Sequence, residues 1–247
     1  MARINPLSLL NILVLSSLAA SALLVDYNAA RGDDPAVIGS RELEAERGVK
    51  VKENSDGLYI KSDVDRRGTK CAHFHRNETS IRTEYHALNK KTKSGETYFI
   101  GYEFALGATP HALMVWQWKE YEANSGGGGA NIPLSLEIRD GELQLGYSSD
   151  GGASRAPQWK TAIKPETTYT VGLEILAKSS GGHVKLWWGG EPVTFSTSGT
   201  NVVEGNMFPG RSDPKFGAYR GEGVVVDAYV YQVQIGNTKG ELDSKFF

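Results

Sequence analysis

Apolar and polar residues alternate in a series of short segments that runs from residue 57 to near the C-terminus. Between Tyr169 and Ile175, every second residue is large and apolar, and the residues between them are smaller or polar. A period of two predicts β-strands with one buried face and one solvated face, as in antiparallel sheets. Such segments lie at residues 58–61, 70–76, 80–88, 98–106, 112–121, 134–139, 142–148, 168–177, 183–188, 193–195, 215–220 and 224–235.

Turn signals separate the predicted strands. Asp140-Gly141 and Gly189-Gly190 are two-residue hairpin signals, and the glycine-rich stretch 125–130 predicts a flexible loop. No segment has the period of an amphipathic helix, and no internal repeat of the kind that marks propellers or solenoids is present. The pattern therefore predicts an all-β sandwich or barrel. Residues 57–247 are expected to form a single domain, since such folds run to about 200–250 residues.

The N-terminus has the pattern of a secretory signal peptide. Arg3 precedes a mostly apolar run over residues 7–25, and the small residues 20–22 offer a cleavage site. We assign residues 1–22 to the signal, although cleavage after residue 29 or 30 also fits. A membrane anchor is the alternative, but polar residues interrupt the run and no basic cluster follows it. The mature protein is thus expected to be secreted, extracellular and free of the membrane.

Residues 23–56 are charged and poor in aromatic side chains, and their alternation is unclear. We interpret them as an N-terminal arm with one edge strand near Val49–Val51. Cys71 is the only cysteine, which excludes an internal disulfide, and its apolar neighbours predict a buried, inert thiol. The sequon Asn77-Glu78-Thr79 predicts an exposed, glycosylated Asn77.

Composition narrows the classes of function. The formal net charge is −2, which gives no argument for binding nucleic acid. Aromatic residues reach 10 % of the chain, including five Trp and eleven Tyr, as in proteins that hold sugars. We expect a monomer whose partner is an acidic polysaccharide, because a cleft can be basic on a nearly neutral protein.

Four predicted strands carry polar side chains on one face. With a period of two, these faces consist of Arg82, Glu84 and His86; of Gln117 and Lys119; of Lys215, Gly217 and Tyr219; and of His73 and His75. If the faces converge on one concave sheet, their cations and amides would line a groove for an anionic sugar chain. Gly217 would leave room for the ligand to approach the backbone.

The same residue types suit β-elimination at a uronic acid. Removal of the C5 proton places negative charge on the C6 carboxylate, which an arginine or an amide can offset. A histidine or tyrosine can take the proton, and a tyrosine can protonate the departing O4. This chemistry requires no cofactor.

Three of these segments resemble the blocks of the jelly-roll alginate lyases of polysaccharide lyase family 7. The family's Arg-x-Glu, Gln-x-His and Lys-x-Gly-x-Tyr strands resemble residues 82–84, 117–119 and 215–219, in the same order. Lys119, however, stands where the family carries its catalytic histidine. The run 205–210 and the block 216–222 are more similar to glucuronan lyases, polysaccharide lyase family 20.

The resemblance implies a β-jelly-roll sandwich of two antiparallel sheets with a concave substrate groove. It implies endolytic cleavage of β-1,4-glucuronan and a structural calcium ion away from the groove, whose ligands no motif identifies. Arg82 and Gln117 would neutralise the substrate carboxylate, and Tyr219 would be the acid and a candidate base. His75 is the first choice for the missing histidine, ahead of His86 and His73.

The remaining polar residues of these faces are expected to bind substrate: Lys119, Lys215, His73, His86 and Glu84. A lysine base would need a strongly lowered pKa, which is why we do not assign Lys119 to catalysis from sequence. Two other functions fit a β-sandwich. One is a non-catalytic carbohydrate-binding module or lectin. The other is a glycoside hydrolase using the acids near Glu137 and Glu142, although Asp140 between them is needed for the hairpin turn.

Overall fold

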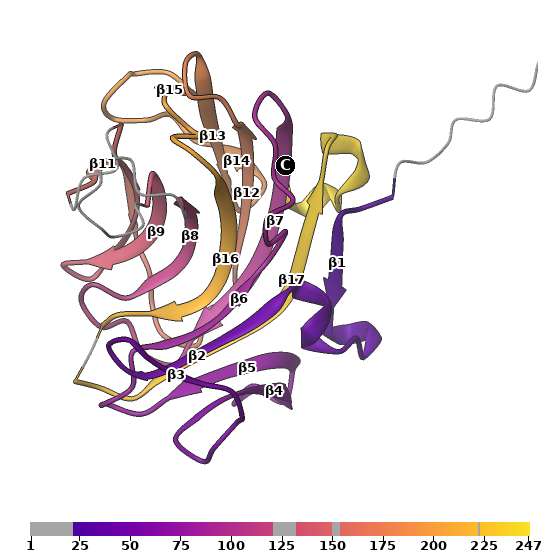
Figure 1. Ribbon diagram of the computed structural model, residues 1–247, viewed down its shortest axis with the longest axis vertical. Coiled ribbons are helices and arrows are strands. Elements are labelled where there is room, and N and C mark those ends of the chain that lie inside the picture. The colour runs from indigo at the N-terminus through magenta and orange to yellow at the C-terminus, as the bar shows by residue number, and fades with distance from the viewer. Residues whose placement is uncertain (1–21, 121–131, 150–153, 222) are drawn as a thin grey trace, which may run out of the picture.

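The computed structural model describes residues 22–120, 132–149, 154–221 and 223–247, which form two antiparallel β-sheets packed face to face (Figure 1). The nine-stranded sheet has the order β14-β13-β12-β7-β17-β5-β4, with β1 paired to β17 and β15 paired to β13. The eight-stranded sheet has the order β11-β10-β9-β8-β16-β6-β2-β3. Residues 1–21 of the predicted signal peptide and the predicted loop at 125–130 lie outside the described residues.

The strands of the nine-stranded sheet are β1 (Val25–Asn28), β4 (Leu58–Val64), β5 (Lys70–Arg76), β7 (Thr97–Leu106), β12 (Tyr169–Leu176), β13 (Gly182–Trp188), β14 (Glu191–Pro192), β15 (Val203–Gly205) and β17 (Val226–Gly236). Those of the eight-stranded sheet are β2 (Ser40–Glu46), β3 (Val49–Val51), β6 (Arg82–His86), β8 (Met114–Glu120), β9 (Leu134–Arg139), β10 (Glu142–Tyr147), β11 (Ala156–Ala162) and β16 (Ser212–Tyr219).

Helical structure in the described chain is limited to four short 3-10 turns, η1 (Ala29–Arg31), η2 (Pro35–Ile38), η3 (Lys239–Glu241) and η4 (Ser244–Phe246). Within these described residues, the structure contains no helix that is long and apolar enough to cross a membrane. The predicted all-β jelly-roll sandwich of two antiparallel sheets is confirmed.

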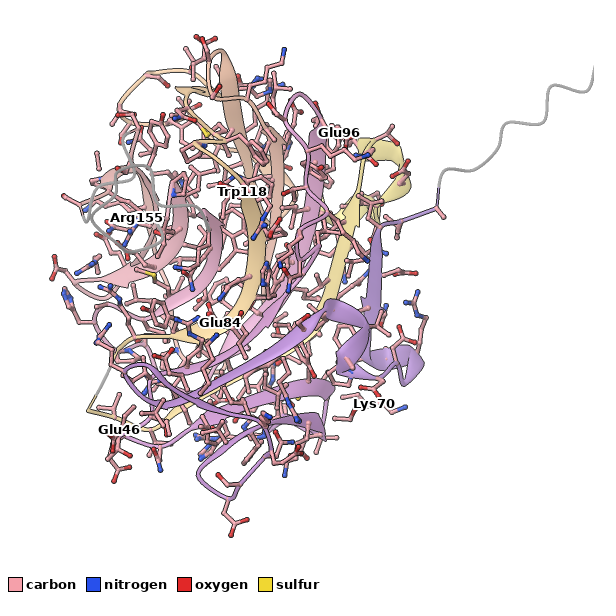
Figure 2. All side chains as sticks on the ribbon, in the orientation of Figure 1. Glu46, Lys70, Glu84, Glu96, Trp118 and Arg155 are labelled. Atoms are coloured by element: carbon pink, nitrogen blue, oxygen red, sulfur yellow. The ribbon has the colours of Figure 1, made fainter. Side chains whose placement is uncertain are left out.

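One large apolar core fills the space between the sheets. Trp116 and Trp118 of β8 both point into it, and Trp118, labelled in Figure 2, donates its indole N–H to the carbonyl of Met207 at 2.7 Å. Phe216 of β16 meets Tyr102 of β7 across the core, with ring centroids 5.1 Å apart. Since side chains alternate along a strand, the residues between these anchors face the opposite, outer side of the eight-stranded sheet.

Most predicted strands are present with nearly the predicted bounds, and both hairpins form. Asp140 and Gly141 have φ of 51° and 80°, as a tight hairpin turn with two left-handed residues requires. The predicted strand at 193–195 is wrong: β14 ends at Pro192, and Phe195 instead closes a turn with Thr200. Phe195 is buried by packing rather than by pairing in a sheet.

The N-terminal segment contributes more strands than the sequence predicted. β1 pairs with β17 in one sheet, and β2 pairs with β6 in the other. The expected edge strand at Val49–Val51 is β3, which pairs with β2. The charged pattern of β2 conceals it, because three of its glutamates, at positions 42, 44 and 46, alternate with Leu43 and Ala45.

Cys71 is a free, buried thiol, as predicted, and burial raises its pKa to about 12. Asn77 is half-buried rather than exposed. Its side-chain oxygen accepts hydrogen bonds from the backbone N–H and the hydroxyl of Ser80 and from the hydroxyl of Thr79. Asn77 therefore organises the turn before β6, and its glycosylation stays a prediction.

Candidate active site

The outer face of the eight-stranded sheet gathers the polar residues that the sequence analysis singled out on three strands. β16 lies between β6 and β8, with Lys215 opposite both His86 and Gln117, and Tyr219 opposite Arg82. The strands of this sheet bend strongly (Figure 1), and their polar face lies away from the core. Arg82, Gln117 and Tyr219 thus share one face of a curved sheet.

Arg82 is the centre of this face. Its guanidinium group lies 2.9 Å from a carboxylate oxygen of Glu42 and 3.1 Å from one of Glu44. It also lies 3.5 Å from Glu84 Oε2 and stacks over the ring of Tyr219, with 4.3 Å between Cζ and the ring centroid. These contacts fix the orientation of Arg82 and hold its positive charge beside Tyr219.

Glu84, labelled in Figure 2, connects Arg82 to β8, because its Oε1 accepts a hydrogen bond from the side-chain amide of Gln117. Glu84 and Gln117 are both fully buried beneath the outer layer of side chains. Lys215 is also buried and forms an ion pair with Glu42, and its Nζ lies 3.8 Å from Glu84. Glu84 and Lys215, both expected to bind substrate, therefore form the floor of the face and brace the residues above them.

His86 is part of the same floor. Its Nε2 lies 3.0 Å from Asp213 Oδ2, and its Nδ1 lies 3.6 Å from Glu42 Oε1. Burial alone would lower the pKa of His86, but these two carboxylates outweigh it and raise the pKa. A buried imidazole whose nitrogens both face carboxylates of the protein is poorly placed to take a proton from substrate.

The surroundings of Lys119 lower its pKa, whereas those of His86 raise the pKa of the imidazole. Burial lowers the pKa of Lys119 to about 8, and repulsion from Lys215 and Arg82 adds to the effect, against the attraction of Glu84 and Glu42. It lies on the same face as Gln117, two residues further along β8. An amine with this pKa is partly neutral near neutral pH and can accept a proton.

Tyr219 ends β16 and is 8 % exposed; it belongs to an apolar cluster with Ile81, Met114 and Ile132, and Arg82 stacks on its ring. None of the described residues makes a hydrogen bond with its hydroxyl group. The chain just after it is held by the buried Arg76, which donates to the carbonyls of Arg220 and Gly221. The ring is thus fixed, and the hydroxyl remains available to a ligand.

The structure explains the glycine at position 217 differently from the sequence. Its φ is 135°, and a Cβ atom at this position would collide with the carbonyl oxygen of Thr83 and approach Phe74. The glycine therefore permits close approach of β16 and β6, rather than of a ligand to the backbone.

The prediction that His75 and His73 line the groove is wrong. Both lie on β5 in the nine-stranded sheet, and their neighbours Ala72 and Phe74 point into the core. The two imidazoles therefore lie on the outer side of the other sheet, beside Asp227, with the core between them and Arg82. Alternation along β5 predicted correctly that they share a face, but it carries no information on which sheet they join.

Glu42 and Glu44 are site residues that the sequence analysis missed. They come from β2, which pairs with β6 and brings both carboxylates to Arg82. Burial would raise the pKa of Glu42, but His86, Lys215 and Arg82 lower it well below its usual range. The cations of the face are therefore matched by carboxylates, and the face is closer to neutral than the predicted basic groove. The spacing of the two glutamates on either side of Leu43 was the available signal.

Comparison with known proteins identifies the fold. No family model and no curated protein matches this sequence. Among solved structures, the chain is similar to alginate lyase A1-II', a member of polysaccharide lyase family 7, with a TM-score of 0.58 and 16 % identity over 83 % of this chain and 99 % of that chain. It is also similar to an alginate lyase from Pseudomonas aeruginosa, with a TM-score of 0.53 and 12 % identity over 81 % and 98 % of the two chains.

These likenesses define the class of fold: the protein has the jelly-roll fold of family 7 alginate lyases. A variant of A1-II' solved in complex with product superposes with a TM-score of 0.57 at 16 % identity, over 83 % of this chain and 99 % of that chain. At such identities the likeness concerns the fold, so the function of this chain has to be argued from its own side chains.

The calcium ion implied by the family 20 resemblance stays a prediction. Within the described part of the chain, one group of three or more His, Cys, Asp and Glu side chains is close enough to hold a metal ion, namely His73, His75 and Asp227. Two of its three donors are imidazole nitrogens, whereas calcium prefers oxygen ligands. This group therefore does not fit the expected calcium ion.

Proposed function

We propose that the protein is a polysaccharide lyase that cuts a polyuronate chain by β-elimination on the outer face of the eight-stranded sheet. The observation that carries the proposal is the stacking of the Arg82 guanidinium group on the ring of Tyr219, on the face that also holds Gln117 and Lys119. The alginate lyase fold supports the same reaction class. A secreted enzyme of this class would meet its polymer outside the cell.

Arg82 would act on the C6 carboxylate of the sugar, and the buried Gln117 would support it through Glu84. As the C5–H bond breaks, negative charge develops on that carboxylate, and fixed hydrogen-bond donors stabilise it without having to reorganise. Arg82 is held by Glu42, Glu44 and Glu84, and the Gln117 amide is held by Glu84. Because Arg82 is already oriented, it would need little reorganisation to meet the carboxylate.

Tyr219 would give its hydroxyl proton to O4 as the C4–O4 bond breaks. Its ring is fixed by Arg82 and by apolar neighbours, and its hydroxyl has no hydrogen-bond partner among the described residues. The guanidinium group of Arg82 lies over the ring from which the proton leaves. The products are a new chain end and a C4=C5 double bond in the other fragment.

Lys119 is our candidate for the base that removes the C5 proton, in place of the histidines first considered. His75 and His73 lie on the other sheet, and His86 is buried between two carboxylates. Lys119 combines a place on the outer face with a pKa of about 8. It stands in the position where the resemblance to family 7 places a histidine. Tyr219 remains the alternative base.

For the substrate we propose β-1,4-glucuronan, cut endolytically, with alginate as the nearest competitor. The choice rests on the resemblance of the run 205–210 and the block 216–222 to glucuronan lyases.

The test is an assay of purified protein on glucuronan, alginate and other polyuronates, with ultraviolet absorbance and reducing ends measured together. A lyase produces both signals in equal number, because each cut creates one unsaturated uronate. Reducing ends without absorbance would indicate a hydrolase instead. Binding of the polymer with neither signal would indicate a non-catalytic module, a reading that the charge-matched face of Arg82, Lys215 and their glutamates also permits.

Tyr219→Phe is expected to lower kcat for uronate cleavage by at least about 100-fold, as loss of a general acid does, while polymer affinity changes little. Tyr169→Phe is the matched control, because Tyr169 lies on the nine-stranded sheet and its hydroxyl accepts a hydrogen bond from the backbone N–H of Lys164. Full turnover by the Tyr219 variant would remove this residue from the mechanism.

A further inference from the structure

A second polar cluster lies on the outer face of the nine-stranded sheet, remote from the proposed active site. His73 and His75 of β5 face the neighbouring strand β17, where Asp227 pairs in register with His75. Asp227 Oδ1 lies 2.8 Å from His73 Nε2 and 2.7 Å from His75 Nδ1. Two imidazole nitrogens thus converge on a single carboxylate oxygen.

The separations suit a small divalent cation. Zinc binds nitrogen at about 2.0–2.1 Å and carboxylate oxygen at about 2.0–2.2 Å, so ligand atoms around it lie roughly 3 Å apart. The three donors of the cluster lie within 4.8 Å of one another. A metal ion between the three donors would replace the two hydrogen bonds to Asp227 with three bonds to the ion.

The surroundings of the cluster resemble the outer shell of a metal site. The other ring nitrogen of His73, Nδ1, lies 3.3 Å from Asp63 Oδ2, the carboxylate contact that commonly fixes the tautomer of a metal-binding histidine. The ring of Tyr59 stacks on His75, with centroids 4.8 Å apart, and Tyr229 packs against His73 at 4.9 Å. Both imidazoles are therefore held in place on two sides.

The charges around the cluster also fit a cation. The carboxylate of Asp227 lies between the two imidazoles and supplies one negative charge. Asp63 supplies a second negative charge. Two cations lie nearby, Lys61 next to Asp63 and Arg66 3.6 Å from the other oxygen of Asp227, and both are at least half-exposed and able to turn toward solvent.

We propose that His73, His75 and Asp227 bind a divalent transition-metal ion, with zinc as the first candidate. Their side chains are 13 %, 18 % and 15 % exposed, so an ion can enter from solvent and water can complete its coordination. Two nitrogens and one carboxylate favour zinc over calcium. The ion would join β5 to β17 near the edge of the nine-stranded sheet, which makes it a stabilising cross-link that is independent of the proposed lyase chemistry.

The experiment uses untagged protein stripped of metal with a chelator and dialysed. Zinc chloride is expected to bind with one ion per chain, measured by equilibrium dialysis and elemental analysis. At a zinc concentration about 100 times Kd, Tm should rise by about 5–10 °C. Asp227→Asn and His75→Gln should each abolish the rise. Cobalt(II) should give the visible absorption bands of an ion with nitrogen ligands, which tests the wild-type protein without any substitution.

His183→Gln is the matched control, because His183 pairs with a single carboxylate, Glu174, at 2.9 Å on the same sheet. This variant should keep the full zinc response. The proposal is overturned if wild-type protein neither binds zinc nor gives cobalt bands, if calcium stabilises it and zinc does not, or if the Asp227 and His75 variants respond like wild type. Uronate cleavage is assayed separately on the metal-free protein, so failure of one proposal leaves the other intact.

Discussion

Two lysines of the polar face show how burial and partners set different roles for one residue type. Lys215 is buried but forms ion pairs with Glu42 and Glu84, so its charge is compensated. Lys119 instead lies near two other cations, and burial together with their repulsion lowers its pKa to about 8. The first lysine is suited to bracing the sheet, and the second to proton transfer.

If Lys119 is the base, it must be neutral to act. The kcat/KM for uronate cleavage is then expected to increase as pH rises through about 8 and to level off above that value. Lys119→Arg, which stays protonated, should lower activity by at least about 100-fold. Lys160→Arg, at an exposed lysine paired with Glu142, should keep the wild-type profile. If kcat/KM of the Lys119 variant rises with pH as in the wild type, another residue takes the proton.

The backbone conformation of Gly217 leads to a prediction about stability. Its φ of 135° is strained for any side chain, and an added methyl group would meet the backbone of β6. Gly217→Ala is expected to lower the free energy of unfolding by at least about 2 kcal/mol, measured by urea denaturation. Gly240→Ala, where a Cβ meets nothing within 4 Å, should change it by less than about 0.5 kcal/mol.

At the scale of elements, β2 connects the N-terminal segment to the candidate site. The strand adds Glu42 and Glu44 to the sheet at the position where Arg82 and Lys215 need counter-charges. Without β2, the face would hold a surplus of cations, and the buried floor would lose its compensation. The segment is therefore part of the site rather than an arm beside it.

Glu42→Gln tests this role of β2. The change removes the carboxylate that faces Lys215, Arg82 and His86, and loss of one partner of a buried ion pair costs about 3–5 kcal/mol. We expect a loss of unfolding free energy at the lower end of that range, because Glu42 is partly exposed. Glu46→Gln, at the exposed end of the same strand, should have little effect. Equal stability of the two variants would contradict the account.

How far the sequence predicts the structure depends on the element. Alternation identified β5, β9 and most other core-facing strands, because their inward residues are apolar. It missed β2 and β11, since charged or polar residues dominate both and only the pairing partner reveals the strand. Spacing placed Arg82, Gln117 and Tyr219 on matching faces. It could not decide that His75 belongs to the other sheet, because sheet membership depends on contacts between distant parts of the chain.

At the scale of the whole molecule, paired carboxylates predict how stability depends on pH. The pKa values of Glu42, Glu137 and Asp213 are lowered by neighbouring cations and hydrogen bonds, although burial opposes the shift. Their stabilising contribution is present above the unfolded-state pKa of about 4 and is lost as pH falls. Tm should therefore drop steeply below about pH 4 in thermal unfolding scans.

The stabilising contribution of His86 depends on pH in the opposite sense to that of the carboxylates. Its pKa is raised in the folded protein, so its contribution is present below the unfolded value of about 6.5 and is lost as pH rises through the folded value. Together, the two effects place the maximum of Tm in mildly acidic solution, at about pH 5–6. Asp213→Asn should weaken the dependence of Tm on pH on both sides of the maximum, because Asp213 contacts His86 directly. A Tm maximum in alkaline solution would contradict this account.

The placement of the tryptophans has a spectroscopic consequence. Trp116 and Trp118 are sealed between the sheets, Trp159 and Trp188 pack against that interior, and Trp187 meets Phe247. None of the five indoles takes part in the described contacts of Arg82, Gln117 and Tyr219. Intrinsic fluorescence should therefore shift to the red when the protein unfolds, yet remain almost silent when a saccharide binds. Ligand titrations will need calorimetry or a labelled oligosaccharide.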